Sequence, residues 1–185
     1  MSVIRTSRLQ LREFNCDDAE FILELLNEAG FIRYLGDKGV RTLADARDYL
    51  LQGPMDSYAR NGFGLYATCF RDGTPIGICG LVKRDGLNDP DVGFAFLSRH
   101  CAQGYAVESA AAVLAHGQRV LQLRRIVAIT SAENAGSIAV LERIGLKFER
   151  MIRLTEQSPE LKLFGPGENL GTPDERSVMA FPGIY

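Results

Sequence analysis

The sequence predicts an α+β fold, in which about four helices cover a mixed, mostly antiparallel sheet of seven strands. Residues 63–97 give the clearest indication, because three strand-like segments follow one another with short connections, as in an antiparallel meander. Residues 104–130 add a helix and then a β-branched segment. A helix that connects two strands of one sheet makes them parallel, with a right-handed crossover, so the sheet is expected to be mixed.

The chain begins with one expected strand, because apolar residues alternate over residues 3–14. Residues 15–18 contain Asn and Asp side chains, which accept hydrogen bonds from free helix N–H groups. They are therefore expected to cap a helix over residues 19–26, which Gly30 ends. A second helix is expected from Thr42 to Leu50.

Gly53 and Pro54 are expected to interrupt this second helix, because proline lacks the N–H group that a helix interior needs. Residues 55–59 add at most one further turn. The later elements, in chain order, are strands over 63–70, 76–82 and 91–97, a helix over 104–121, a strand over 125–130, a helix over 137–143, and strands over 146–154 and 161–164. Asp72-Gly73 predicts a tight turn between the first two of these strands, and Gly145 a left-handed cap after the last helix.

The length of 185 residues fits one domain, expected over residues 1–165, with an irregular tail rich in Gly and Pro over 166–185. The formal net charge is −2, so the basic excess of a general nucleic-acid binder is missing. No apolar run is long enough to span a membrane, and the N-terminus shows no signal peptide. We therefore expect a cytoplasmic protein that binds neither nucleic acid nor membranes.

The four cysteines and two histidines do not indicate a metal site or a disulfide framework. No two cysteines form a CxxC pair, and His100 and His116 do not complete a zinc pattern. We interpret Cys69 and Cys79 as small core residues.

One segment carries the first indication of chemistry. Residues 97–108 pass from a strand end through a loop into a helix, and a helix start offers unpaired N–H groups and a partial positive charge. Small residues at Gly104 and Ala106 let an anion approach the backbone closely. The segment thus favours a diphosphate site built from backbone amides, with the alternative that Gly104 merely permits a sharp turn.

A second segment, residues 134–146, begins where the expected parallel strand ends. Asn134 and Ser137 stand at the start of its helix. Taken alone, this pattern favours the simpler interpretation that Asn134 or Ser137 only caps the helix.

Taken together, the two segments resemble the GNAT N-acetyltransferase superfamily. Residues 103–108 are similar to its acetyl-CoA diphosphate motif, and residues 134–146 to its following motif, N-x-x-S-x-x-x-L-x-x-x-G-(F/L). The opening residues 6–12, TSRLQLR, resemble the branch of ribosomal-protein alanine acetyltransferases, of the RimJ and RimL type. The resemblance covers roughly residues 5–165.

The resemblance implies an enzyme that moves acetyl from acetyl-CoA to a primary amine by direct attack. It also implies a GNAT-like fold in which strands 91–97 and 125–130 splay apart to admit the pantetheine arm. Asn134 and Ser137 would line the cofactor near its thiol. The remaining cofactor-binding residues implied are Phe96, Leu97, Ala102, Gln103, Gly104, Tyr105, Ala106 and Val107.

The sequence departs from the superfamily pattern at two positions. Cys101 replaces the usual Gln or Arg three residues before Gly104. Leu141 stands where many members carry a tyrosine general acid. Ser137, near the start of the helix that should flank the thioester, is a candidate to assist the departing thiol, with a cap role for Ser137 and protonation by water as the alternatives. Cys101 as a nucleophile and Glu108 as a base are the less favoured readings.

Three functions stay open at this level: acetylation of a peptide N-terminus, acetylation of a small amine, or CoA binding without turnover. The acceptor pocket is expected between the first two helices, the loop 83–90 and the turn between the last two strands.

Overall fold

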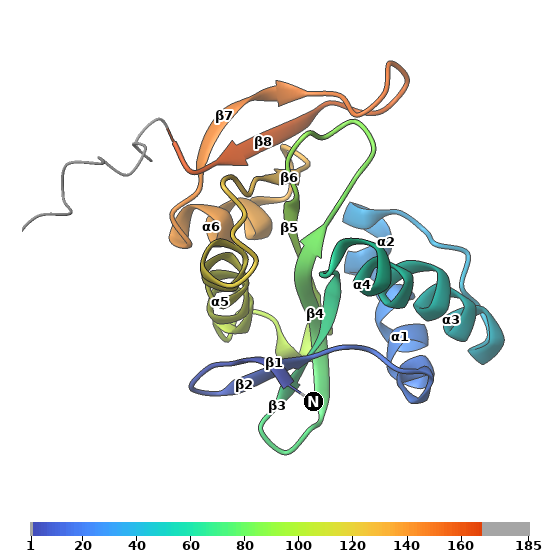
Figure 1. Cartoon of the computed structure of the whole chain (residues 1–185). Coiled ribbons are helices and arrows are strands. Elements are labelled where there is room, and N and C mark those ends of the chain that lie inside the picture. The colour runs from blue at the N-terminus through green and yellow to red at the C-terminus, as the bar shows by residue number, and fades with distance from the viewer. Residues whose placement is uncertain (1, 168–185) are drawn as a thin grey trace, which may run out of the picture.

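In the computed structural model, which describes residues 2–167, the strands form two sheets (Figure 1). The larger has the order β1-β2-β3-β4-β5 and the smaller the order β6-β8-β7, and all pairs of neighbours are antiparallel. The strands are β1 Ser2–Arg5, β2 Leu9–Arg12, β3 Leu65–Phe70, β4 Pro75–Val82, β5 Asp91–Phe96, β6 Ala128–Thr130, β7 Lys147–Ile152 and β8 Leu161–Gly165.

Helices cover both faces of the larger sheet. The α-helices are α1 Ala19–Leu26, α2 Ala29–Leu35, α3 Leu43–Leu50, α4 Asp56–Asn61, α5 Tyr105–Arg119 and α6 Ala135–Arg143. Helices α1 to α4 lie on one side, and α5 and α6 on the other (Figure 1). Each side has its own apolar core, so the sheet is buried between two layers. The predicted α+β class is confirmed.

Strands β5 and β6 run parallel and meet only at one end. Asp91 and Val127 form an isolated parallel bridge. The Val92 N–H donates to the Val127 carbonyl at 2.8 Å, and the Val127 N–H donates to the Pro90 carbonyl at 3.0 Å. Beyond this bridge β5 pairs with β4 alone and β6 with β8 alone among the described strands. The expected splay between these two strands is therefore present.

The first predicted strand is in fact a hairpin. Residues 2–12 form β1 and β2, which pair antiparallel, so the structure has one strand more than the seven expected. Thr6 closes the turn, because its hydroxyl oxygen accepts from the Leu9 N–H at 3.0 Å and its backbone N–H donates to the Leu9 carbonyl at 3.0 Å. The alternation of apolar residues continues across this turn, which hides it from a periodicity argument.

Two further expectations about helix boundaries are wrong. Gly30 does not end a helix but lies inside α2, whose Phe31 is buried in the core beside α1. Gly53 and Pro54 do not interrupt the second helix either. Residues Leu51–Met55 form a π-helical turn that connects α3 to α4. Pro54 has no N–H group to donate, and the wider π-helical turn tolerates this loss. The chain therefore stays helical from α3 through residues 51–55 into α4.

Predictions that rest on local chemistry are confirmed. Asn15 and Thr42 each cap a helical start with a reciprocal capping box. Gly73 and Gly145 have φ angles of 96° and 90°, the left-handed values that their turn and cap require. Cys69 and Cys79 are fully buried core residues, and burial raises the pKa of Cys79 to about 12.

No helix in residues 2–167 is both long enough and apolar enough to cross a membrane. The predicted tail over residues 166–185 lies outside the described residues, apart from its first two positions.

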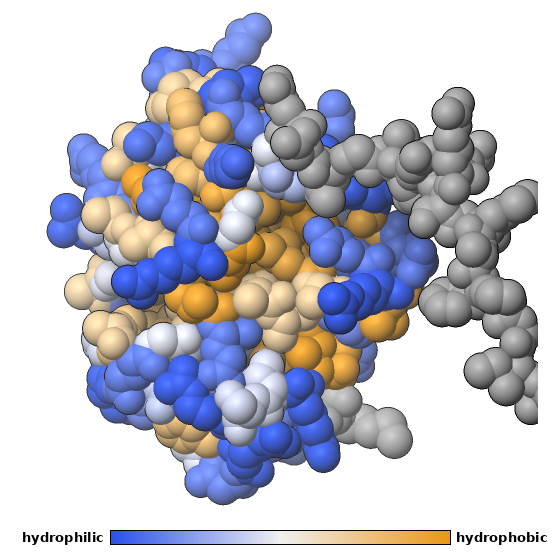
Figure 2. Space-filling view, turned by 90° about the vertical axis from the view of Figure 1, so that its left-hand side faces the viewer, coloured by the Kyte–Doolittle hydropathy of each residue, from blue (hydrophilic) through white to orange (hydrophobic). Residues whose placement is uncertain are grey.

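The face that carries α5 and α6 has an apolar centre framed by hydrophilic residues (Figure 2).

Candidate functional site

A cavity of about 520 Å³ lies beside β5, under α2 and next to the first turns of α5 and α6. The cavity lies where β5 and β6 diverge. After β5 the chain continues into α5, and after β6 into α6, so the starts of both helices border the cavity. Its lining is mostly apolar, and polar groups converge at the two helix starts. The predicted site residues that line it are Phe96, Ala102, Gly104, Tyr105, Ala106, Val107, Asn134 and Ser137.

The loop before α5 presents a row of free backbone N–H groups. Within residues 2–167, no acceptor bonds to the amides from Ala102 to Val107, and the helical ladder begins only with the Glu108 N–H, which donates to the Gly104 carbonyl at 3.0 Å. Ala102 and Gly104 have φ angles of 59° and 82°, and such left-handed residues turn successive N–H groups toward one side. A left-handed conformation is costly for alanine and marks a constrained loop. The arrangement fits an anion with several oxygens, such as a diphosphate.

Leu97 and Gln103 are predicted site residues that the structure places outside the cavity lining. The Leu97 side chain is fully buried in the core, and its N–H donates to the Ile76 carbonyl at 3.1 Å. Its carbonyl already accepts from the His100 N–H at 2.8 Å. The Gln103 side chain turns back to the Arg99 carbonyl at 3.1 Å, so only its backbone amide stays available. The Leu97 side chain is therefore part of the core, and both of its backbone groups already have a partner within the fold.

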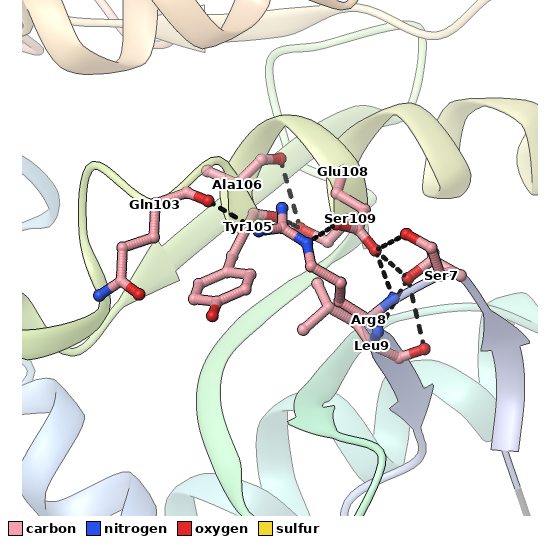
Figure 3. Close-up of polar contacts among 9 residues, drawn as sticks. Ser7, Arg8, Leu9, Gln103, Tyr105, Ala106, Glu108 and Ser109 are labelled. Carbon is pink, nitrogen blue, oxygen red and sulfur yellow. Dashed lines mark hydrogen bonds and ion pairs between the residues drawn. The ribbon is translucent and has the colours of Figure 1, made fainter.

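An ion pair from the N-terminal hairpin holds this loop (Figure 3). The Arg8 Nε donates to Glu108 Oε2 at 2.6 Å, and the Arg8 Nη1 donates to the Gln103 carbonyl at 3.0 Å. The Arg8 guanidinium also lies over the Tyr105 ring, 4.5 Å from its centroid. One side chain of the hairpin thus contacts three successive features of the loop and of the start of α5.

Glu108 is fully occupied by this hairpin and is not a base. Its carboxylate accepts from the Thr6 hydroxyl at 2.6 Å, the Ser7 hydroxyl at 3.0 Å and the Arg8 N–H at 2.9 Å. Burial alone raises its pKa, but the bonds from Thr6, from both groups of Arg8 and from Ser7 outweigh it and lower the pKa to about 2. A carboxylate with so low a pKa holds no proton at neutral pH and has little tendency to accept one.

In the second motif, residues 134–146, capping of the helix and contact with the cavity fall to different side chains. Asn134 is the cap of α6, because its Oδ1 accepts from the Ser137 N–H at 3.0 Å. Ser137 is the capped residue rather than the cap, and among the described residues its hydroxyl has no partner. Its side chain lines the cavity and remains free to donate to a ligand. Leu141, at the position of the missing tyrosine, is buried in the core.

Cys101 lines the cavity but is not an activated nucleophile. Burial and then the nearby Glu28 carboxylate raise the pKa of its thiol, whereas a reactive cysteine has a lowered one. Its sulfur lies 3.6 Å from the Leu97 carbonyl. His100 packs edge-on against Phe70.

Sequence reasoning missed the contribution of α2. Phe31, Tyr34 and Leu35 of this helix line the cavity together with Glu28 at its start. The sequence does carry a signal for this helix, because apolar residues recur three and four positions apart after Gly30, but a glycine at this place also predicts a helix end.

A second cavity of about 550 Å³ adjoins the first. Phe31, Leu35 and Phe94 line both, so the two cavities meet at the middle of β5. The second is lined by residues of α2, α3 and α4 and by residues 83–85. Of the expected contributors, the helix over 42–50 and the loop over 83–90 line this cavity, whereas the helix over 19–26 and the turn between β7 and β8 do not.

Comparisons with known proteins agree with this geometry. Residues 8–147 match the family model for the acetyltransferase (GNAT) domain. YnaD of Bacillus subtilis, described as an uncharacterized N-acetyltransferase, is 29% identical over 147 residues, which are 79% of this chain and 83% of YnaD.

Two solved structures show the same fold. The first is an acetyltransferase of the GNAT family from Bacillus anthracis, with a TM-score of 0.72, 24% identity, and coverage of 88% of this chain and 96% of that one. The second is RimL, described as a ribosomal L7/L12 α-N-protein acetyltransferase in complex with coenzyme A, with a TM-score of 0.77, 19% identity, and coverage of 89% and 97%.

Proposed function

Because this chain belongs to the GNAT acetyltransferase family and is an acyl-CoA-dependent N-acyltransferase, we propose that it moves acetyl from acetyl-CoA to the amine of a peptide or protein N-terminus. The observation that carries the proposal is the meeting of two cavities at Phe94, one of which lies against the row of free amides before α5. Two cavities that share a wall suit two substrates that react directly with each other.

The first cavity fits acetyl-CoA. The amides from Ala102 to Val107 would hold the diphosphate, with the partial positive charge at the start of α5 behind them. The edge of β5 next to Phe96 has no strand partner beyond Asp91, so its backbone groups are available to the pantetheine arm. Asn134 and Ser137 would flank the other side of that arm.

The second cavity would receive the amine. The free base of the acceptor attacks the thioester carbonyl, and the negative charge that develops on the carbonyl oxygen needs a hydrogen-bond donor. Unpaired N–H groups on the free edge of β5 are suited to that role. The thiol leaves toward the start of α6, where the Ser137 hydroxyl is free to donate.

A peptide N-terminus is favoured by the opening residues 6–12, which resemble the ribosomal-protein acetyltransferases, and RimL shares this fold. A small amine is the second candidate, because a volume of about 550 Å³ lies in the range of small-molecule sites.

The experiment measures thiol release from acetyl-CoA with two panels of acceptors. The first contains short peptides with a free N-terminus, each matched to the same peptide with a blocked N-terminus. The second contains small amines. We expect release with the free peptides only. Release with small amines alone would favour the second candidate, and release with neither panel would overturn both.

A further inference from the structure

The second cavity contains an arginine that a buried carboxylate holds in place. The Arg84 Nε donates to Asp91 Oδ1 at 2.7 Å. The Asp91 side chain is only 2% exposed and the Arg84 side chain 36% exposed. Asp91 sits at the start of β5, where that strand bridges to Val127. The ion pair therefore joins the cavity wall to the rigid point from which β5 and β6 diverge.

The bond to Asp91 uses only one of the nitrogens of Arg84. Among residues 2–167, no partner bonds to its terminal nitrogens Nη1 and Nη2, while the side chain lines the cavity. A guanidinium anchored through Nε keeps its terminal N–H groups for a second, planar acceptor. Such an arrangement is suited to a carboxylate, which accepts two parallel hydrogen bonds.

Other lining groups favour the same kind of ligand. Tyr49 lines the cavity near Arg84, and its hydroxyl has no partner in the described part of the chain. Lys38 and Lys83 also line the cavity; the Lys83 Nζ donates to the Asn88 carbonyl at 2.9 Å, and neither lysine forms an ion pair within residues 2–167. Of the two carboxylates in the lining, Asp56 is paired with Arg60 at 2.5 Å, which leaves Asp85. The charge that the cavity offers to a ligand is therefore positive.

We propose that the acceptor of this enzyme carries a carboxylate near its amine and that Arg84, positioned by Asp91, binds it with help from Tyr49. This inference rests on the proposed function, because it assigns the second cavity to the acceptor. Phe94, at the junction of the cavities, follows Asp91 by three residues, which is about 10 Å along a strand. That spacing suits an acidic side chain near the N-terminus of a peptide. If the small amine that is the second candidate were the acceptor, the α-carboxylate of an amino acid would fit the same distance.

The test compares matched acceptors that differ in one charge. Alanine and alaninamide differ in the α-carboxylate, and the amides of alanyl-aspartate and alanyl-asparagine differ in a side-chain carboxylate. We expect kcat/KM to be about tenfold to a hundredfold higher for the charged member of at least one pair. The pair that shows the preference identifies the source of the carboxylate.

The variant that tests the residue is Arg84→Gln combined with Asp91→Asn. The double substitution removes both charges. A single change at Arg84 would leave the Asp91 carboxylate buried without a partner, and that would destabilise the fold. We expect the preference to fall to about onefold, with an unchanged KM for acetyl-CoA and an unchanged thermal midpoint. Arg119→Gln, at an exposed position on α5, is the control for the loss of an arginine outside the cavity and should keep the preference.

Several results would overturn the inference. One is equal activity toward both members of each pair, and another is a preference that survives in the double variant. If the double variant has a lower thermal midpoint, Arg84→Lys decides, since lysine keeps a charge but cannot bind Asp91 and a carboxylate as a planar fork. A preference unchanged in Arg84→Lys would then reject the inference. A protein that acetylates none of the amines would reject the proposed function as well.

Discussion

Arg8 and Glu108 lie 100 positions apart in the sequence, and their side chains form an ion pair at 2.6 Å. The pair joins the turn of the N-terminal hairpin to the first turns of α5. Since Arg8 also donates to the Gln103 carbonyl, the hairpin positions the loop whose amides face the first cavity. The opening residues Thr6, Ser7 and Arg8 thus have a structural role beside the first cavity (Figure 3).

Glu108→Gln should weaken this contact and loosen the loop. Because hydrogen bonds to a charged group are lost, we expect the free energy of unfolding to fall by about 1–2 kcal/mol, and the KM for acetyl-CoA to rise by about tenfold. Thermal unfolding and steady-state kinetics measure the two effects. An unchanged KM would show that the hairpin stabilises the fold without positioning the loop.

The stability effect of Glu108 should depend on pH. Its pKa of about 2 in the folded protein lies below the value of about 4.3 for an unperturbed glutamate. The contribution of Glu108 is therefore complete above about pH 5 and declines as the pH falls toward 2. We expect the stability difference between wild type and Glu108→Gln to shrink over this interval in urea unfolding curves. A constant difference down to pH 2 would contradict the lowered pKa.

Ala106→Asp should abolish acetyl-CoA binding without unfolding the protein. The new carboxylate would lie beside the free amides and repel a diphosphate. Wild type should gain about 2.7 kcal/mol of stability at a hundredfold excess of acetyl-CoA over its dissociation constant. The variant should show no gain in the same thermal titration. Ala111→Asp, at an exposed position on the same helix, is the matched control and should bind normally. Normal binding by Ala106→Asp would mean that the loop holds no diphosphate.

Ser137→Ala tests whether this hydroxyl assists the departing thiol. Asn134 caps α6 and the Ser137 backbone N–H remains, so the cap bond survives the substitution. We expect turnover to fall by about tenfold to a hundredfold, with cofactor affinity little changed. Asn134→Ala removes the cap and should instead cost about 1 kcal/mol of stability. A normal turnover rate in Ser137→Ala would assign protonation of the thiol to another group, such as water.

Thr68→Val should stabilise the protein. Thr68 is fully buried in the middle of β3, and its Oγ1 has no hydrogen-bond partner in the described part of the chain. Valine has the same shape and no polar atom to desolvate, so we expect a gain of about 1 kcal/mol. Chemical denaturation measures it. A loss of stability would show that the hydroxyl is satisfied in solution.

The sequence alone determined the features that depend on neighbouring residues. The capping box at Asn15, the tight turn at Gly73 and the left-handed cap at Gly145 follow from side chains and φ angles within a few positions. The free amides before α5 belong to this group, because any helix start leaves its first N–H groups unpaired. The fold class and the free amides of the proposed donor site were therefore predictable.

Only the tertiary structure decided the features that join distant segments. The first strand became a hairpin whose turn is held by Glu108, far along the chain. Gly30 remained helical because Phe31 is buried beside α1, and this burial outweighs the weak helix propensity of glycine. The pairing of Arg84 with Asp91 exists because β5 brings a buried carboxylate beneath the loop. No local pattern encodes such contacts, since their energy comes from burial that the whole fold creates.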